Sequence, residues 1–222
     1  KDFLKHRLGI GNIPFQISLD VPKKKFVLFK DELEEKPRYL KENYEMLYDV
    51  PVNLDLTKNN LIGIVGGREK QGAIEVAKSI SAQIAANNCY TDVKMGFIYN
   101  GEEESQSIQW NYAKWLPHTW SEDKKTRYVA DNKELASEVF YELTKIFRTR
   151  IEEQKEKQGK ESTLPKPYYI LFISDAALLE GELITKYIFE NEKICGLTTF
   201  ILTQRYEELP NACNFIIENT AE

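Results

Sequence analysis

The residues with the clearest chemical potential follow a short apolar run, where glycines and a lysine stand close together. The apolar run is Leu61–Val65, and the residues after it that matter here are Gly66, Gly67, Lys70, Gln71, Gly72 and Ala73. Phosphate-binding loops have the pattern Gly-x-x-x-x-Gly-Lys-Ser/Thr between a buried strand and a helix. Their amides hold phosphate, the lysine reaches the β and γ phosphates, and the hydroxyl holds Mg²⁺. The context here suits that chemistry.

The residue types at the required positions do not match the pattern. Counting from Gly66, the second glycine falls on Gln71, the lysine on Gly72 and the Ser/Thr on Ala73. Lys70 stands two positions early. A rearranged loop could present it to a phosphate, but we favour a solvated residue of the first helical turn. The glycines also suit turns and close helix–strand packing. The sequence therefore predicts a degenerate nucleotide-binding loop.

A second apolar run ends in an acidic residue, as the Mg²⁺-binding strand of such NTPases does. Tyr168–Ile173 leads to Asp175, and the next residue is Ala176 where a water-orienting glutamate is often found. Alanine cannot activate water, and no hydroxyl stands at position 73 to hold Mg²⁺. We therefore expect Asp175 to act as the N-cap of a helix over 176–191.

The two losses together predict that the domain does not hydrolyse nucleotide. Removing charge stabilisation and removing water positioning each costs roughly 3 kcal/mol of transition-state stabilisation, by analogy with the deletion of single hydrogen-bond donors. We therefore predict no catalytic residues, no metal and no cofactor in this domain.

Other candidate residues are better explained by structure than by catalysis. We favour a packed, hydrogen-bonded role for His118 over a general base. Asp20, Asp49 and Asp55 suit turns. The aromatic residues between 110 and 120 could form a protein-binding patch, but packing of a long insertion is favoured. Those aromatic residues are Trp110, Tyr112, Trp115 and Trp120.

Cysteine and histidine usage argues against a zinc site. Cys89, Cys195 and Cys213 lie far apart, and the histidines are His6 and His118 alone. This pattern lacks metal-ligand spacing and is typical of reduced thiols in a reducing compartment.

The elements that must position these residues are read from hydrophobic periodicity. In the first part of the chain we predict strands at 13–19 and 26–29, then a helix opening at Pro37 with Leu40, Tyr44 and Leu47 on one face. After Val52, strands and helices alternate, which implies a mainly parallel sheet with helices on both faces. The predicted strands are 61–65, 93–99, 128–130, 168–173, 197–203 and 215–217. The predicted helices are 69–86, one that opens at Asp131 with a capping box to Glu134, and 176–191; residues 101–107 read as a surface loop.

The charge balance disfavours nucleic acid as the main partner. The formal net charge of the 222 residues is −5, whereas DNA and anionic lipid attract cationic surfaces. The run Lys23–Lys25 could form a local basic patch, although a solvated turn is favoured. No apolar run is long enough to span a bilayer. Because the chain begins at Lys1, we expect a piece of a longer protein, with any membrane anchor outside it.

The order and spacing of several motifs resemble FtsK/SpoIIIE-type ATPases. The carrying segments are Asp49–Asp55 followed by Leu61–Gly66, Pro167–Asp175, and Gly196–Arg205, whose end supplies a third motif at Gln204 and Arg205; Asn211–Asn219 also fits. More narrowly, Leu8–Gly11 with Ile13-Pro14, and Lys114–His118, resemble the membrane-proximal ATPase-like domain of type VII secretion motors. These are the EssC/YukB proteins of Firmicutes and the EccC proteins of actinobacteria.

This resemblance implies a fold, a place and a role. It implies a RecA-like P-loop NTPase fold over 51–222, with a β-rich N-terminal extension over 1–50. It places the domain in the cytoplasm of a Firmicute, after two transmembrane helices and before three ATPase domains, in a motor that assembles as a hexamer and exports WXG100-type proteins. It implies a degenerate first domain that couples the membrane part to the ATPases. The partners would be other domains of the motor and membrane components of the system, without nucleic acid.

Three alternatives remain open at this stage. The domain could be an ATPase that uses Lys70 and Asp175 in an unusual arrangement. It could be a DNA translocase module, by kinship with FtsK. It could also sense nucleotide without turnover, holding the adenine firmly and the phosphates loosely.

Overall fold

The computed structural model describes residues 3–15, 32–156, 164–190 and 195–220. The chain divides into two compact units, and each is described by itself. One unit comprises residues 7–54, and the other comprises residues 1–6 together with 55–222.

The unit of residues 7–54 contains a two-stranded sheet of β1 (Lys5–Pro14) and β2 (Met46–Asp55), with helix α1 (Glu32–Asn43) between them in sequence. The predicted helix exists but its bounds are wrong, because α1 includes Pro37 in its interior and Leu47 lies in β2. Apolar residues alternate with polar ones or proline from Val50 onward, which is the strand period. The predicted strand at 26–29, the turn at 23–25 and residues 16–19 of the first predicted strand lie outside the described residues.

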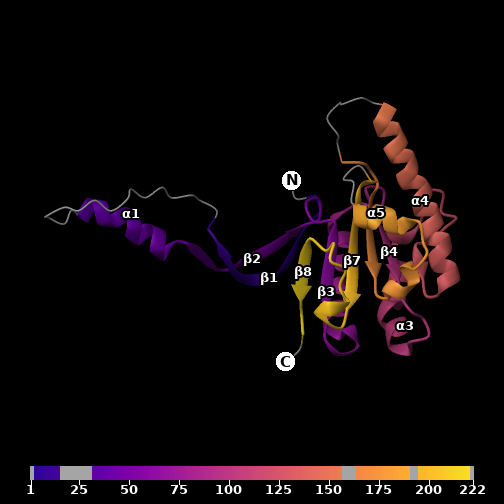
Figure 1. Cartoon of the computed structure of the whole chain (residues 1–222), viewed down its shortest axis with the longest axis horizontal. Helices are drawn as coiled ribbons and strands as arrows, with labels where there is room; N and C mark the ends of the chain where they lie inside the picture. The colour runs from indigo at the N-terminus through magenta and orange to yellow at the C-terminus, as the bar shows by residue number, and fades with distance from the viewer. Residues whose placement is uncertain (1–2, 16–31, 157–163, 191–194, 221–222) are drawn as a thin grey trace. The chain divides into compact units, whose positions relative to one another are not determined.

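The larger unit is built on a six-stranded sheet in which every neighbouring pair is parallel, with the order β5-β4-β6-β7-β3-β8 (Figure 1). This confirms the predicted α/β class with a parallel sheet. The strands are β3 (Leu61–Val65), β4 (Val93–Ile98), β5 (Val129–Ala130), β6 (Tyr168–Ile173), β7 (Leu197–Thr203) and β8 (Phe215–Glu218). The four inner strands are buried along their whole length because the sheet is covered on both faces.

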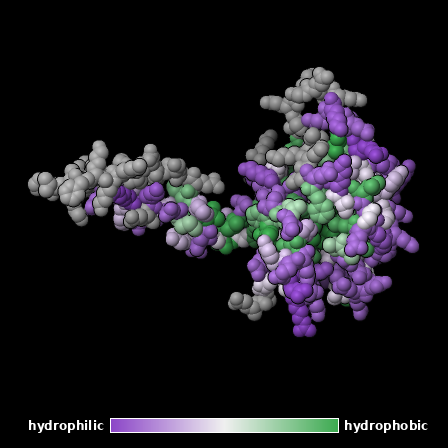
Figure 2. Space-filling model, in the orientation of Figure 1, coloured by the Kyte–Doolittle hydropathy of each residue, from purple (hydrophilic) through white to green (hydrophobic). Residues whose placement is uncertain are grey.

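Helices cover both faces of this sheet. The helices are α2 (Gln71–Asn87), α3 (Glu104–Trp110), α4 (Lys133–Glu156) and α5 (Ile184–Glu190). Helices α4 and α5 pack on the face that carries Tyr169, Leu171 and Ile173. On the other face Phe97, Phe172 and Phe200 stack on one another, and Trp110 of α3 packs against them. The visible surface of this unit is dominated by polar residues (Figure 2), as in a sheet whose apolar side chains are enclosed.

Several helix boundaries differ from the predictions. Residues 104–107 form the start of α3 and not a loop. The N-cap of α4 is Asn132, whose side chain accepts a hydrogen bond from Leu135 N at 3.0 Å, so the Asp131 capping box is wrong. Consequently Ala136 and Phe140 face the core, while Leu135 is 41% exposed. The predicted 176–191 helix is a 3₁₀ turn (Ala176–Leu179) followed by α5.

The first strand begins at Lys5 and not at residue 13, and α2 begins at Gln71 and not at residue 69, while the predicted strands of the large sheet agree with the structure to within a residue. Helix α2 buries Ile74, Ala77, Ile80 and Ile84, and Asn88 caps its end through hydrogen bonds to Ile84 O. None of the helices within the described ranges is long and apolar enough to cross a bilayer.

Candidate functional site

The three motifs singled out in the sequence meet at one edge of the sheet. Because β3, β6 and β7 are parallel, the segments that leave their carboxyl ends lie along the same edge, where open α/β sheets bind ligands. The loop 66–73 follows β3, Asp175 follows β6 and Gln204 follows β7. Val65 is in register with Thr203, and Gly66 N donates to Thr203 O at 3.0 Å.

Backbone N–H groups of the loop donate hydrogen bonds to carbonyl groups of the same loop. Lys70 N donates to Gly67 O at 3.0 Å, and Gly72 N donates to Gly66 O at 3.1 Å. The N–H of Gln71 donates to Arg68 O. A phosphate cradle needs such N–H groups to point at the ligand. In this loop three consecutive amides, at residues 70–72, point at carbonyls of the loop instead.

Positive φ angles make this closed conformation possible. Gly67 has φ of 65°, and the adjacent non-glycine residues Glu69 and Lys70 have φ of 54° and 56°. Each left-handed non-glycine residue costs roughly 1 kcal/mol. The surrounding packing must compensate for this cost, so the loop is held in place by its neighbours.

Lys70 is one of the residues that hold it. Its side chain is half-buried, and its ammonium donates to the carbonyl oxygen of Ser174 at the end of β6. Ser174 is fully buried, and its hydroxyl donates to Gln106 Oε1 of α3 at 2.8 Å. The prediction of a solvated lysine is therefore wrong. Lys70 joins the loop after β3 to the end of β6, across the intervening strand β7.

The glycines of the loop are required by packing. A Cβ on Gly72 would lie 1.7 Å from Asn219 O, and one on Gly66 would lie 2.1 Å from Ala73 N. Asn219 follows β8 and is bonded to both ends of the bend: its N–H donates to Val65 O, at the end of β3, at 2.9 Å, and its side chain donates to Gly72 O of the loop at 3.0 Å. No sequence pattern predicts this role for Asn219.

Residues of the second and third motifs form hydrogen bonds to residues close to them in the sequence. The carboxylate of Asp175 accepts from Ala177 N at 3.0 Å, which confirms the predicted capping role, while Ala176 is exposed. Gln204 and Arg205 are exposed, and both are bonded to Glu208. Gln204 N donates to Glu208 Oε2 at 3.0 Å, and Arg205 Nε donates to Glu208 Oε1 at 3.1 Å. None of these contacts forms a metal site, and no group of three or more potential metal-binding side chains occurs among the described residues.

The aromatic segment 110–120 divides into a buried and an exposed part. Trp110 is 1% exposed, in line with the packing interpretation, whereas Trp115 is 83% exposed. His118 is buried and its Nε2 lies 2.9 Å from Asn88 O, which confirms the predicted hydrogen-bonded role.

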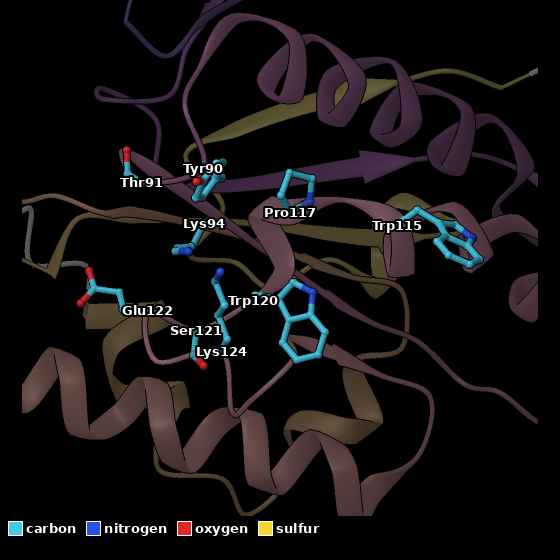
Figure 3. Close-up of a pocket in the computed structure, with 9 residues that line it drawn as sticks. All are labelled: Tyr90, Thr91, Lys94, Trp115, Pro117, Trp120, Ser121, Glu122 and Lys124. Atoms are coloured by element: carbon cyan, nitrogen blue, oxygen red, sulfur yellow. The ribbon is translucent and has the colours of Figure 1, made fainter.

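One buried charged residue was missed by the sequence interpretation. Lys94 is only 4% exposed although it carries a charge, and it lies on the wall of a pocket with Tyr90, Trp120 and Lys124 (Figure 3). The available signal was a lone lysine in the otherwise apolar strand Val93–Ile98.

Comparison with known proteins finds that the chain is similar to type VII secretion proteins. No family model matches it. It is 24% identical over 218 residues to the type VII secretion system protein EssC of Staphylococcus aureus, covering 98% of this chain and 14% of that protein. It is 28% identical over 123 residues to the ESX-3 secretion system protein EccC3 of Mycobacterium tuberculosis, covering 53% of this chain and 8% of that protein. The chain thus spans a small part of these relatives.

Solved structures support the fold. The cytoplasmic domain of EssC superposes with a TM-score of 0.59 at 14% identity, covering 78% of this chain and 35% of that one. ATPases 2 and 3 of EssC from Geobacillus thermodenitrificans give a TM-score of 0.58 at 14% identity, covering 81% and 35%. The α/β unit therefore has the fold of the EssC ATPase domains, and the chain is homologous to part of the EssC/EccC type VII secretion ATPases.

Proposed function

We propose that this chain is a non-catalytic, ATPase-like domain of a type VII secretion motor. The observation that carries the proposal is the self-bonded loop at 66–73. Three of its amides bind its own carbonyls, and its lysine binds Ser174 O. No hydroxyl stands at Ala73, and no carboxylate stands at Ala176.

The chemistry of phosphoryl transfer explains why these features matter. The reaction depends on positioning and on electrostatic stabilisation of the phosphate oxygens and of Mg²⁺. Opening the loop for phosphate would require breaking its internal hydrogen bonds and its contacts with Asn219. Each missing donor or base costs about 3 kcal/mol of transition-state stabilisation, or roughly a hundredfold in rate. The proposed role is therefore mechanical.

In the proposed role the domain couples a membrane-anchored part of the motor to downstream ATPase domains during export of WXG100-type proteins. Homology to EssC and EccC supports this context. The proposed partners are other domains of the same motor and membrane components of the system, in a hexamer on the cytoplasmic side of a Firmicute plasma membrane. Nucleic acid is not a proposed partner, in keeping with the net charge of −5.

Calorimetric titration of the chain with Mg·ATP, combined with a phosphate-release assay, tests whether the domain lacks nucleotide binding and hydrolysis. We expect no saturable binding up to about 1 mM nucleotide, where a site of ordinary affinity would be filled, and no release above buffer. Saturable binding with turnover would contradict the proposal. Lys70→Ala and the neighbouring Arg68→Ala, whose side chain is 94% exposed, would then report whether Lys70 carries that activity.

A second candidate is an ATPase with an unusual loop, and one observation favours it. The Lys70 ammonium reaches the end of β6 at Ser174, the residue before Asp175. A loop opened by a neighbouring domain could therefore present this lysine to a phosphate near that carboxylate. Turnover that disappears in Lys70→Ala but persists in Arg68→Ala would support this candidate over the inert domain.

A further inference from the structure

The pocket that contains Lys94 lies away from the 66–73 loop, near the amino end of β4. It has a volume of about 630 Å³, within the range of small-molecule sites. Tyr90 and Trp120 contribute aromatic walls, and Lys94 and Lys124 contribute two ammonium groups. In Figure 3 the Lys94 side chain lies below Tyr90, the Lys124 side chain lies between Lys94 and Trp120, and the Trp115 ring lies apart.

Lys94 is the unusual member of this pocket. Lysine is almost never buried without a partner, because desolvation of an ammonium is costly. Lys94 is 4% exposed, yet among the described residues its ammonium has no hydrogen bond or ion pair, and it lies over the Tyr90 ring, 5.7 Å from the ring centroid. Glu122 also lines the pocket but does not pair with it. The pocket therefore holds an ammonium with no hydrogen-bond or ion-pair partner among the described residues, and Glu122 acts on it electrostatically without pairing with it.

The aromatic walls are fixed by neighbours outside the pocket. The Tyr90 ring meets the His118 ring edge-on, with centroids 6.5 Å apart, and His118 is anchored to Asn88 O. The centroid of the Trp120 ring lies 4.2 Å from the Arg127 guanidinium, and an antiparallel bridge joins Trp120 and Arg127 across the hairpin of residues 120–127. Both rings are thus held in place before any ligand arrives, which lowers the entropic cost of binding.

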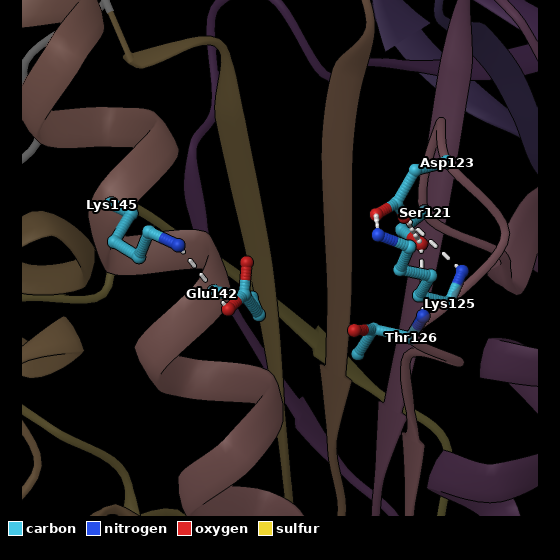
Figure 4. A network of polar contacts seen from close by, with 6 residues as sticks. All are labelled: Ser121, Asp123, Lys125, Thr126, Glu142 and Lys145. Atoms are coloured by element: carbon cyan, nitrogen blue, oxygen red, sulfur yellow. Dashed lines mark hydrogen bonds and ion pairs between the residues drawn. The ribbon is translucent and has the colours of Figure 1, made fainter.

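The second ammonium is also presented by a defined turn. Lys124 has φ of 58° at the tip of the hairpin. The Ser121 hydroxyl donates to Asp123 Oδ1 at 2.6 Å and accepts from Thr126 N at 3.0 Å, while Lys125 N donates to Asp123 at 3.1 Å (Figure 4). These bonds fix the backbone on both sides of Lys124, so that its side chain lines the pocket.

We propose that this pocket is a binding site for a small organic anion, a carboxylate or phosphate carried on an aromatic body. The anion lies between Lys94 and Lys124, where it supplies the ion-pair partner that Lys94 lacks, and the aromatic body packs against Tyr90 and Trp120. None of the residues that line this pocket belongs to the 66–73 loop.

Ligand-observed NMR and calorimetry on the whole chain test the site with defined probes. The probes are 2-naphthoate, 2-naphthyl phosphate, the neutral 2-naphthamide and inorganic phosphate. We expect at least one aromatic anion to bind saturably, and both the amide and inorganic phosphate to bind about tenfold more weakly or worse, because each lacks one half of the recognised chemistry. Comparing the naphthoate with the naphthyl phosphate identifies the preferred anion.

Variants locate the binding. Lys94→Met keeps an unbranched side chain of similar length and removes its charge, so we expect about a tenfold loss of affinity or more. Lys124→Gln should lower the affinity for the aromatic anion severalfold. Lys125→Gln, next along the same hairpin with an equal change in charge, should bind as the parent does. Folding is checked by circular dichroism, and Lys124→Gln keeps the test valid if Lys94→Met does not fold.

Two results would overturn the site. One is the absence of saturable binding of either aromatic anion up to about 5 mM, a concentration that would reveal even a weak site. The other is binding that Lys94→Met and Lys124→Gln leave unchanged. Because no nucleotide is present, neither result bears on the proposed inert loop.

Discussion

The loop after β3 and the pocket beside β4 differ in opposite ways: the loop has a motif position but no free binding groups at its bonded amides and lysine, and the pocket has a binding group left free by the described residues but no motif. The loop stands where a phosphate site is expected, but its amides and its lysine are bonded to the protein itself. The pocket matches no motif, yet Lys94 and Lys124 line it and the Lys94 ammonium has no hydrogen-bond or ion-pair partner among the described residues. Binding capacity thus depends on whether polar groups are left without protein partners, and a motif position alone does not decide this.

The comparison also concerns rigidity. The closed loop is held by Asn219 from the end of β8, by Ser174 from the end of β6 and by hydrogen bonds of its own. If this account is right, changes in the loop should lower stability, whereas changes in the pocket should alter ligand binding.

The largest effect is expected from adding one methyl group to the loop. In Gly72→Ala the new Cβ would lie 1.7 Å from Asn219 O, a backbone atom that cannot rotate away. We expect the free energy of unfolding to fall by about 3 kcal/mol, measured by urea denaturation. Gln71→Ala, the exposed neighbour, is the matched control and should change little. A Gly72→Ala protein as stable as the parent would mean that the loop is not held tightly against Asn219.

The next effect comes from removing the Lys70 ammonium. Lys70→Met leaves the carbonyl of Ser174 without its charged donor, which should lower the free energy of unfolding by about 2 kcal/mol. Arg68→Ala, in the same loop but exposed, should stay within about 0.5 kcal/mol of the parent. Equal effects of the two substitutions would show that Lys70 does not hold the loop.

The pH dependence of anion binding should identify Lys94. Burial lowers the pKa of the Lys94 ammonium, and Lys124 lowers that pKa further, while Glu122 and Cys89 act in the opposite direction. Only the protonated form attracts an anion. Naphthoate affinity should therefore be constant below the lowered pKa and fall by up to about tenfold per pH unit above it.

Calorimetry from pH 6 upward in the Lys124→Gln background measures this dependence with the second lysine absent. Adding Lys94→Met to that background should abolish the dependence, because methionine does not titrate. An equally steep loss of affinity in the double variant would assign the titration to another group.

The smallest effect concerns Asn219. Asn219→Ala removes the side-chain hydrogen bond to Gly72 O and should cost about 1 kcal/mol in urea denaturation. The exposed Asn211→Ala serves as the control and should be neutral. If Asn219→Ala lowered the free energy of unfolding no more than the control does, the side-chain hydrogen bond would not hold the loop, and packing of the Asn219 backbone against Gly72 alone would.

Much of the sheet could be predicted from the sequence because buried parallel strands appear as continuous apolar runs. Tyr168–Ile173 and Leu197–Thr203 were assigned in this way with their correct bounds. Strand β2 was missed because Pro51 reads as a break, although a proline can lie in a short two-stranded sheet.

The candidate site was predictable in position but not in conformation. The glycines at 66, 67 and 72 indicated the bend. Ala73 and Ala176 indicated that a Mg²⁺-binding hydroxyl and a water-orienting carboxylate are absent at these positions. The direction of the Lys70 side chain depends on two consecutive left-handed residues, Glu69 and Lys70, for which the sequence carries no local signal. The partners of Lys70 and Gly72 come from β6 and from the end of β8, more than 100 residues away.

An amide-resolved NMR titration of the isotope-labelled chain tests the contrast between the two regions most directly. On addition of Mg·ATP to about 1 mM, a range that would fill an ordinary nucleotide site, the account predicts no saturable shift of the amides of residues 66–73. On addition of naphthoate or naphthyl phosphate, it predicts saturable shifts around Lys94 and Trp120. Saturable movement of the loop amides with Mg·ATP would contradict the account.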